Sequence, residues 1–379
     1  MSSSMIAMEC PMRVLQAVSI MNRGGLETLV MNLYRHVDRS KIQFDFLVHR
    51  GEEGHFDDEI AALGGTIHRI GYIDSVGHLG YVHALDNFFK SNKQYRIVHS
   101  HMNQTSGLIL RSARRYGIPV RIAHSHACRP RYSAPKAFYK WLIKTLVVCN
   151  ATDLCACSND AALWLFGRKN AASKTKIIRN GIETDAFHLD GYDRDAFRRS
   201  IGVHPGAFVI GHVGRFDKGK NQAFLVDVLG SMAQGMPRAE LVLAGDGTLI
   251  NAVREKARLN GLSEKTHFLG IRKDIPALLS AFDAFVFPSL FEGLPLTLVE
   301  AQAAGLPCIV SDSITREVDL GANLVQFVSL KSGPEEWARR VLSTQRIPQD
   351  TIAIVRKAGY DISESAKDLE RFYIDRCRV

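Results

Sequence analysis

Short apolar runs alternate with amphipathic segments through the first half of the chain. The run Arg13–Ile20 predicts a buried strand, a turn containing two glycines follows it, and Leu26–Val37 has the periodicity of a helix. The pattern recurs around further strand candidates, which are Phe44–Val48, Thr66–Ile70, Ile97–Ser100, Val120–His124 and Leu154–Ala156. Alternation of strands with helices predicts a parallel sheet covered by helices on both faces.

The alternation starts again in the second half of the chain. Phe208–Val213 predicts a strand and Gln222–Met232 a helix, and the later strand candidates are Leu241–Ala244, His267–Leu269, Ala284–Phe287 and Cys308–Val310. The mixed, charged segment 185–206 is typical of a linker. We therefore predict an α/β fold of two doubly wound, Rossmann-like domains, 1–185 and 186–362, that face each other across a ligand-binding cleft.

The composition limits the class of protein. A length of 379 residues suits two domains, and 46% hydrophobic with 23% charged residues is typical of a globular chain. No apolar run reaches the roughly 18 residues of a membrane-spanning helix, and the first residues do not resemble a secretory signal. The seven cysteines are scattered and odd in number, which argues against a disulfide framework and favours a reducing cytoplasm.

Positive charge is concentrated in the first half. The formal net charge is +9, and residues 101–150 contain nine basic residues and no acidic one. Such a segment suits nucleic acid, an anionic membrane or a phosphate-bearing substrate, although a basic surface that only aids solubility is the default interpretation. No recognisable RNA- or DNA-binding module accompanies it, which argues against nucleic acid as a partner.

The most informative motif is the stretch 287–307, which contains two glutamates. A loop after a predicted strand carries Glu292, Gly293 and Leu294, and the helix that follows carries Glu300. The free N–H groups at the start of such a helix favour phosphate, and a nearby carboxylate can accept hydrogen bonds from both hydroxyls of a ribose. Two surface glutamates near an ordinary helix start are an equally good interpretation of the spacing alone.

Two further loops combine glycine with a position directly after a predicted strand. Gly214, Arg215 and Lys220 follow the first strand of the second half, where cations can clamp a diphosphate and stabilise a leaving group. Gly24 and Gly25 follow the first strand of the chain, where paired glycines allow a ligand to approach the backbone. A solvated basic loop and a plain tight turn are the alternative interpretations.

Four histidines lie at the ends of two neighbouring strand candidates. His99 and His101 end one, and His124 and His126 end the next. Because strand ends point into the predicted cleft, we expect at least His101 to touch a sugar or an acceptor. A metal site is the competing interpretation, but the sequence places no carboxylate or thiolate to complete it. Hydrogen-bonded structural histidines are an equally good interpretation for any one of the others.

Together these motifs resemble the retaining glycosyltransferases of family 4, especially the bacterial members that build exopolysaccharide, capsule or lipopolysaccharide chains. The resemblance rests on Glu292-x7-Glu300 followed by Ala301-x-Ala303-x-Gly305-x-Pro307, and on Gly214-Arg215 with Lys220. It covers nearly the whole chain and is strongest in the second half. It implies the GT-B architecture, with an acceptor-binding first domain, a second domain that binds the nucleotide sugar, and a terminal helix, 363–379, that packs back on the first domain.

The resemblance also implies roles in the second domain. Arg215 and Lys220 would hold the donor diphosphate and stabilise it as it departs. Glu300 would bind the ribose hydroxyls, and Glu292 would lie beside the hydroxyls of the donor sugar. Contacts with the base would come from the backbone of Leu269, Gly270, Ile271 and Arg272.

In the first domain, the resemblance implies that Gly24 and Gly25 approach the diphosphate and sugar, and that His101 contacts the sugar near the reacting centre. Glu27 departs from some relatives, which leaves its role open. The family retains anomeric configuration and usually needs no metal, so neither a metal ion nor a cofactor is expected besides the nucleotide sugar. Because no Asp or Glu stands out as a nucleophile, we favour front-face attack by the acceptor, with the leaving phosphate helping to take its proton.

One basic, aromatic segment suggests a membrane surface. Arg129 and Arg131 lead into the helix candidate Ala134–Val148, which carries three lysines at a spacing of four, Lys136, Lys140 and Lys144. A cationic stripe beside aromatic residues suits an anionic bilayer or a polyprenyl-diphosphate acceptor, and we group these residues with His124 and His126 on the acceptor side. An ordinary packed helix with a solvated lysine edge is the alternative.

We therefore predict a retaining hexosyltransferase of surface polysaccharide synthesis. It would move a hexose or N-acetylhexosamine from a nucleotide-diphosphate sugar, with a UDP-sugar favoured, to a saccharide or polyprenyl-diphosphate-linked acceptor. Its location would be cytoplasmic and peripheral, at the inner face of an anionic membrane. A catalytically silent partner of another transferase is the alternative, although every expected donor-contact residue is present. An epimerase of the same architecture would need paired acid and base groups that we do not identify.

Overall fold

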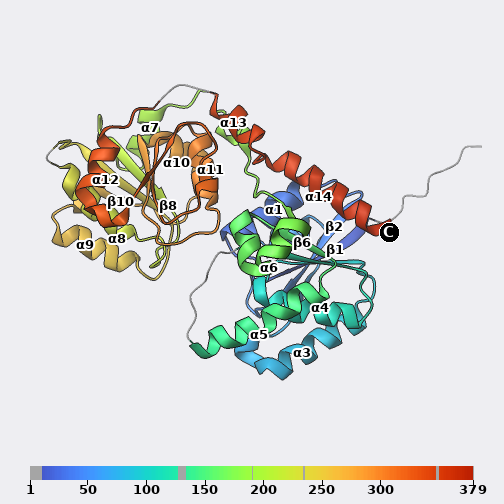
Figure 1. Ribbon diagram of the computed structural model, residues 1–379. Coiled ribbons are helices and arrows are strands. Elements are labelled where there is room, and N and C mark those ends of the chain that lie inside the picture. The colour runs from blue at the N-terminus through green and yellow to red at the C-terminus, as the bar shows by residue number, and fades with distance from the viewer. Residues whose placement is uncertain (1–10, 127–133, 190, 234, 347–349, 379) are drawn as a thin grey trace, which may run out of the picture. The chain divides into compact units, whose positions relative to one another are not determined.

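The computed structural model describes residues 11–126, 134–189, 191–233, 235–346 and 350–378. The chain forms two compact units, Met1–Gly181 with Ile362–Val379, and Ile182–Asp361. Each unit is built around one parallel sheet with helices on both faces (Figure 1). The predicted fold class of two doubly wound, Rossmann-like units is therefore confirmed.

The first unit contains a seven-stranded sheet in the order β3-β2-β1-β4-β5-β6-β7. Its strands are β1 (Met12–Val18), β2 (Ile42–Val48), β3 (Ile67–Arg69), β4 (Ile97–Ser100), β5 (Val120–Ser125), β6 (Asp153–Ala156) and β7 (Thr175–Ile177). Its helices are α1 (Gly25–His36), α2 (Asp57–Ala62), α3 (Ile73–Ser91), α4 (Ser106–Arg115), α5 (Ala134–Asn150), α6 (Asn159–Lys174) and α14 (Ile362–Cys377). The strand order reverses between β1 and β4, so the loops after these two strands leave the same edge of the sheet in different directions.

The second unit contains a six-stranded sheet in the order β10-β9-β8-β11-β12-β13. Its strands are β8 (Phe208–Val213), β9 (Ala239–Ala244), β10 (Thr266–Phe268), β11 (Ala284–Phe287), β12 (Cys308–Ser311) and β13 (Val325–Val328). Its helices are α7 (Arg194–Ser200), α8 (Gln222–Met232), α9 (Ile250–Leu259), α10 (Ile275–Ala281), α11 (Leu296–Ala303), α12 (Gly333–Leu342) and α13 (Thr351–Lys357). The strand order reverses between β8 and β11, and side chains of α8 and α11 belong to separate apolar clusters.

The segment 185–206 is not a linker, so that expectation was wrong. It contains α7, whose first turn is capped by the side chain of Asp193. Arg194 and Arg198 both bind the carboxylate of Asp283, at 2.8 and 2.7 Å. A charged segment that looks solvated in the sequence is therefore fixed to the second unit by ion pairs and by hydrogen bonds to backbone carbonyls.

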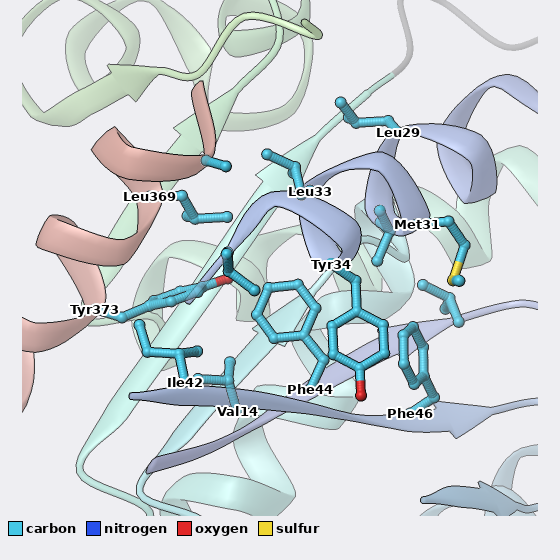
Figure 2. Packing of buried hydrophobic residues seen from close by; sticks show 14 of the residues in the cluster. Val14, Leu29, Met31, Leu33, Tyr34, Ile42, Phe44, Phe46, Leu369 and Tyr373 are labelled. Carbon is cyan, nitrogen blue, oxygen red and sulfur yellow. The ribbon is translucent and has the colours of Figure 1, made fainter. Parts of the chain in front are cut away.

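The terminal helix α14 belongs to the core of the first unit. Figure 2 shows Leu369 and Tyr373 of this helix beside Leu33 of α1 and Phe44 of β2. The terminal helix that the resemblance implied is buried against this unit, with Leu369 2% exposed and Tyr373 fully buried. The first unit therefore needs the last residues of the chain to complete its core.

We expect Leu369→Ala to lower the free energy of unfolding by about 3 kcal/mol, because it removes buried methyl groups and leaves a cavity. Urea denaturation followed by circular dichroism measures this change. Arg371→Ala, on an exposed position of the same helix, is the control and should have little effect. Equal stability of the two variants would show that α14 contributes little to the core.

Candidate functional site

Three loops of the second unit meet at the carboxyl ends of β8, β9 and β10. The amide of Gly214 donates to the carbonyl of Ala244 at 3.0 Å, and the amide of Gly245 donates to the carbonyl of Gly270 at 2.7 Å. A side chain at Gly245 would overlap the carbonyl oxygen of Gly214, so this close approach requires glycine. The predicted base-contact segment 269–272 therefore lies beside the loop that carries the predicted diphosphate cations.

Lys220 and Glu292 form an ion pair between the loops after β8 and β11. Lys220 Nζ lies 2.8 Å from Glu292 Oε1, and the two side chains are only 19% and 16% exposed. The ammonium also lies over the ring of Phe287, 4.8 Å from its centroid. The backbones of the two loops are joined as well, since the amide of Leu290 donates to the carbonyl of Gly219 at 2.7 Å. The sequence predicted both residues as site residues, but not that they bind each other.

Arg215, on the same loop as Lys220, is largely exposed to solvent. Its side chain is 78% exposed, and its Nε lies 3.3 Å from Asp217 Oδ2. The other carboxylate oxygen of Asp217 accepts the backbone N–H of Lys220 at 3.1 Å, so Asp217 shapes the loop that carries both cations. Most of the Arg215 guanidinium is consequently accessible to a ligand.

Glu300 lies on α11, the helix that begins just beyond the Glu292 loop. Its side chain is half-buried, and desolvation raises the pKa of its carboxyl to about 7. Within the described ranges the carboxyl group of Glu300 forms no hydrogen bond or ion pair. A carboxyl group held in this way has acceptor capacity for a ligand that supplies hydroxyl donors.

The sequence did not indicate His212 as a site residue. This histidine lies behind the loop that carries Arg215 and Lys220. Its Nδ1 donates to the carbonyl of Val286 at 3.0 Å, and burial lowers its pKa to about 3, so the ring is neutral. Its Nε2 is buried and has no partner among the described residues, and a side chain at Gly214 would lie 3.1 Å from it. The available signal in the sequence was a histidine one residue before the end of a buried strand.

The hydroxyls of Ser289 and Thr297, which flank the Glu292 loop, are also buried and find no partner in the part of the chain that the structure describes.

Gly293 and Leu294 follow Glu292 in the loop that leads into α11. Leu294 is buried in the apolar cluster, whereas Gly293 is half-buried. Near the base-contact segment, Ile271 is 57% exposed, and Arg272 is held by Asp274 at 2.5 Å. The structure thus joins the loop of Gly214 and Lys220 to the Glu292 loop directly, and to the segment 269–272 through Gly245.

In the first unit, Gly24 and Gly25 lie at the start of α1, directly beyond β1. The space around Gly25 is open, whereas a side chain at Gly24 would overlap the carboxylate of Glu27. Glu27 therefore places negative charge beside the loop predicted to approach a diphosphate. The role of the two glycines in ligand binding stays a prediction.

His101 is buried rather than exposed at the strand end. Its Nε2 contacts Gln16 Oε1 at 2.9 Å and its Nδ1 contacts His126 Nε2 at 2.8 Å. His99, His124 and His126 complete a stack of four imidazoles on β4, β5 and the residues that follow them. Burial lowers the pKa of every ring in this stack, so the four side chains are neutral. A contact between His101 and a donor sugar stays a prediction.

The expectation of a cationic surface stripe on α5 was wrong for Lys140. This side chain is buried and donates to Thr105 Oγ1 at 2.6 Å and to the hydroxyl of Tyr72 at 3.2 Å. Lys144 is half-buried and donates to the carbonyl of Trp164. Both ammonium groups donate to oxygen acceptors inside the unit, which offsets part of the cost of removing these charges from water. Arg129 and Arg131 lie outside the described residues, as does the side chain of Lys136.

The exposed face of α5 is apolar instead. Phe138, Trp141 and Leu142 are each more than half exposed, and the rings of Phe138 and Trp141 stack with centroids 6.0 Å apart. Leu79 of α3 is 82% exposed, and α3 is joined to α5 by the contact of His78 with Tyr139 at 2.7 Å.

Among the described helices, none is both long and apolar enough to cross a membrane.

Comparisons with known proteins find relatives of both units. Residues 207–345 match a family model described as glycosyl transferases group 1, and residues 24–181 match a glycosyl transferase 4-like domain. A putative glycosyltransferase of Bacillus subtilis, EpsF, is 39% identical over 376 residues, which cover 95% of this chain and 96% of EpsF.

Two other proteins are similar over different lengths. An Escherichia coli enzyme, UDP-Gal:alpha-D-GlcNAc-diphosphoundecaprenol alpha-1,3-galactosyltransferase, is 32% identical over 226 residues, 58% of each chain. The structure of HepE from Anabaena in complex with UDP-glucose superposes with a TM-score of 0.77 at 20% identity, over 96% of this chain and 100% of HepE. This structural similarity establishes a shared fold.

The raised pKa of Glu300 predicts a pH-dependent loss of stability. Between about pH 4.5 and pH 7 the folded chain binds a proton that the unfolded chain has released, so stability falls as the pH rises through this window. Glu300→Gln should therefore gain stability over the natural chain from pH 4.5 to pH 7, by at most about 3 kcal/mol. Urea denaturation at pH 5 and pH 8 measures the difference, with Glu264→Gln at an exposed position as the control. An equal difference at both pH values would contradict the prediction.

Proposed function

Because this chain belongs to family 4 of the glycosyltransferases, we propose that it transfers a hexose or N-acetylhexosamine from a UDP-sugar, with retention of anomeric configuration. The acceptor is a saccharide or lipid-linked saccharide in surface polysaccharide synthesis. The observation that carries the proposal is the Lys220–Glu292 pair at the reversal between β8 and β11, with Arg215 exposed on the same loop as Lys220. In open α/β sheets, ligands bind at this reversal.

Lys220 and Arg215 supply the positive charge for the donor diphosphate. The Lys220 ammonium is mostly removed from solvent, so its attraction for a phosphate is stronger than that of a solvated lysine. Glu292 balances this charge before the donor binds. When a phosphate takes over the ammonium, the Glu292 carboxylate becomes able to accept hydrogen bonds from hydroxyls of the donor sugar.

The same charges assist departure of the nucleotide. Negative charge develops on the β-phosphate as the bond to the sugar breaks, and Lys220 and Arg215 are placed to stabilise it. The first turn of α11 adds free N–H groups, and Thr297 lies in that turn with an unpartnered hydroxyl. With these groups holding the diphosphate, we expect no metal ion in the donor site.

The carboxylates near the Lys220–Glu292 pair are consistent with front-face attack. Asp217 is held by Arg215 and by the amide of Lys220, and Glu292 exchanges its partner Lys220 for hydroxyls of the donor sugar when the donor binds. Both carboxylates are therefore engaged in hydrogen bonds and are not assigned as covalent nucleophiles. The acceptor hydroxyl therefore attacks from the side of the departing phosphate, which takes its proton. Anomeric coupling in the NMR spectrum of the product tests retention.

The nucleoside is held by the half-buried Glu300 and the adjoining loops. The Glu300 carboxyl accepts hydrogen bonds from the ribose hydroxyls, and the exposed Ile271 contacts the base. UDP as the nucleotide is supported by HepE, whose structure contains UDP-glucose, and by the galactosyltransferase relative, whose name specifies UDP-Gal. The diphosphoundecaprenol acceptor in that name supports a lipid-linked acceptor here.

The apolar face of α5 supports association with a bilayer. Exposed Trp and Phe side chains on a helix favour the interface of a membrane, and this helix lies within the basic segment 101–150. We therefore place the enzyme on an anionic membrane surface at the cytoplasmic side, where Phe138, Trp141 and Leu142 enter the interface. Because Lys140 and Lys144 donate to acceptors inside the unit, we assign the membrane contact to these apolar residues and not to the lysines.

We expect Lys220→Ala to reduce the rate of UDP release from the correct UDP-sugar about 100- to 1000-fold, because one charge that stabilises the leaving group is lost. Lys218→Ala, two residues away on an exposed position, is the matched control and should leave the rate nearly unchanged. The correct donor is identified first by a thermal-shift panel of UDP-, GDP-, ADP- and dTDP-sugars. Equal rates for the two variants, or no donor that stabilises the chain, would refute the assignment.

We expect the double variant Phe138→Ser with Trp141→Ser to bind anionic lipid vesicles about 10-fold more weakly, because two apolar side chains no longer enter the interface. Sedimentation with vesicles that contain phosphatidylglycerol measures binding. Leu259→Ser removes an equally exposed apolar side chain from α9 of the other unit and serves as the control. Unchanged sedimentation of the double variant would exclude α5 as the membrane contact.

A further inference from the structure

We propose that His99, His101, His124 and His126 form a binding site for one divalent transition-metal ion inside the first unit. Three of them, His99, His101 and His124, each offer a ring nitrogen within 4.8 Å of the others. The imidazoles belong to a different unit from the predicted diphosphate cations, so the test for the ion needs no nucleotide sugar, although His101 is also the residue predicted to contact the donor sugar.

The backbone brings the four rings together. β4 and β5 are neighbouring parallel strands in which His99 pairs with Ile122 and Ser100 with Ala123. Because side chains alternate along a strand, His99 and His101 share a face of the sheet with His124 and His126. The rings of His99 and His101 stack with centroids 4.3 Å apart, and those of His124 and His126 lie tilted by 35° with centroids 3.9 Å apart.

Two pairs of nitrogens face each other in this stack. His99 Nε2 lies 3.0 Å from His124 Nδ1, and His101 Nδ1 lies 2.8 Å from His126 Nε2. In a tetrahedral site with bonds of about 2.0–2.1 Å, neighbouring ligand nitrogens are about 3.3–3.4 Å apart, so each pair would need to separate by roughly half an ångström to bind one ion. Small rotations of the rings would turn the lone pairs from each other toward a shared centre.

In His99 and His101, the ring nitrogen that does not face another histidine already has an oxygen partner. Such partners orient histidines that bind metals. His99 Nδ1 contacts the hydroxyl of Tyr373 at 2.6 Å, and His101 Nε2 contacts Gln16 Oε1 at 2.9 Å. Gln16 Nε2 also donates to the Tyr373 hydroxyl at 3.2 Å, which joins the two supports. Oxygen partners on the far nitrogen fix the tautomer and orientation of ligand histidines.

The protonation state also favours an ion. Metal ligands must be neutral imidazoles, and burial keeps all four rings neutral at pH 7. Gln16 Oε1 can only accept, so the proton of His101 lies on Nε2 and the lone pair of Nδ1 faces His126. His126 then needs only a change of tautomer to present Nε2 to an ion, because its Nδ1 is free to take the proton.

Two unpartnered nitrogens show that hydrogen bonding alone does not satisfy the stack. His124 Nε2 and His126 Nδ1 are buried and have no partner in the described part of the chain. Each such group costs about 1–3 kcal/mol, so the hydrogen bonds among the described residues do not fully compensate the burial of these rings.

The ligand set selects the ion. The group that the described residues form contains imidazoles and no carboxylate or thiolate. Imidazole nitrogen favours Zn²⁺, Cu²⁺ and Ni²⁺ over Mg²⁺, Ca²⁺ and Mn²⁺, which prefer oxygen. Zn²⁺ is therefore the probe, because it has no redox chemistry and accepts tetrahedral nitrogen ligation.

The full chain, purified without a polyhistidine tag, is stripped with a chelator, dialysed against Zn²⁺ and analysed by mass spectrometry of the metal. We expect one Zn²⁺ per chain, and zinc-edge X-ray absorption with three or four nitrogen ligands at about 2.0–2.1 Å and the scattering pattern of imidazole. Absence of a stoichiometric ion, or ligation by oxygen or sulfur, would overturn the proposal even if every variant failed to fold.

Substitutions of the histidines and of Tyr373 test where the ion binds. His99→Asn with His124→Asn should abolish stoichiometric binding. His49→Asn, which alters another buried histidine with an unpartnered Nε2 outside the stack, should bind normally. Tyr373→Phe should weaken binding about 10- to 100-fold through loss of the support behind His99. Full binding by a folded double variant would place the ion elsewhere and refute the site.

Discussion

The ion pair between Lys220 and Glu292 determines the organisation of the second unit's site. It joins loops that leave β8 and β11 at the point where the strand order reverses, and its low exposure makes the interaction strong. Phe287 lies beneath the ammonium, and Asp217 shapes the loop from the other side. A cation held in this way is ready for an anionic ligand, because its orientation is fixed before the ligand arrives.

A second constraint acts in the first unit, where the end of the chain completes the core. Tyr373 of α14 contacts both Gln16 and His99, which lie more than 270 positions earlier in the sequence. The polar stack beneath this helix is buried and neutral, so each missing hydrogen bond has a real energetic cost. Removal of α14 would expose both the apolar cluster and the histidines.

Several features of the site were predictable because they depend on local pattern. Glycine after a strand, cations in the next loop and a glutamate on the next helix placed Lys220, Glu292 and Glu300 at one edge of a sheet. The raised pKa of Glu300 was not predictable, because desolvation depends on side chains from distant segments. His212 was missed for the same reason, since only its neighbours show that it is buried behind the loop.

The sequence by itself determined the two parallel sheets, because the alternation of apolar strands and amphipathic helices is a local property of the chain. It also determined which loops carry charge. The tertiary structure decided where that charge points. Lys140 lies on a regular stripe in the sequence yet donates to Thr105 inside the unit, and segment 185–206 is fixed by Asp283. A long charged side chain turns toward the hydrogen-bond acceptors within its reach. Those acceptors lie on segments that only folding brings together.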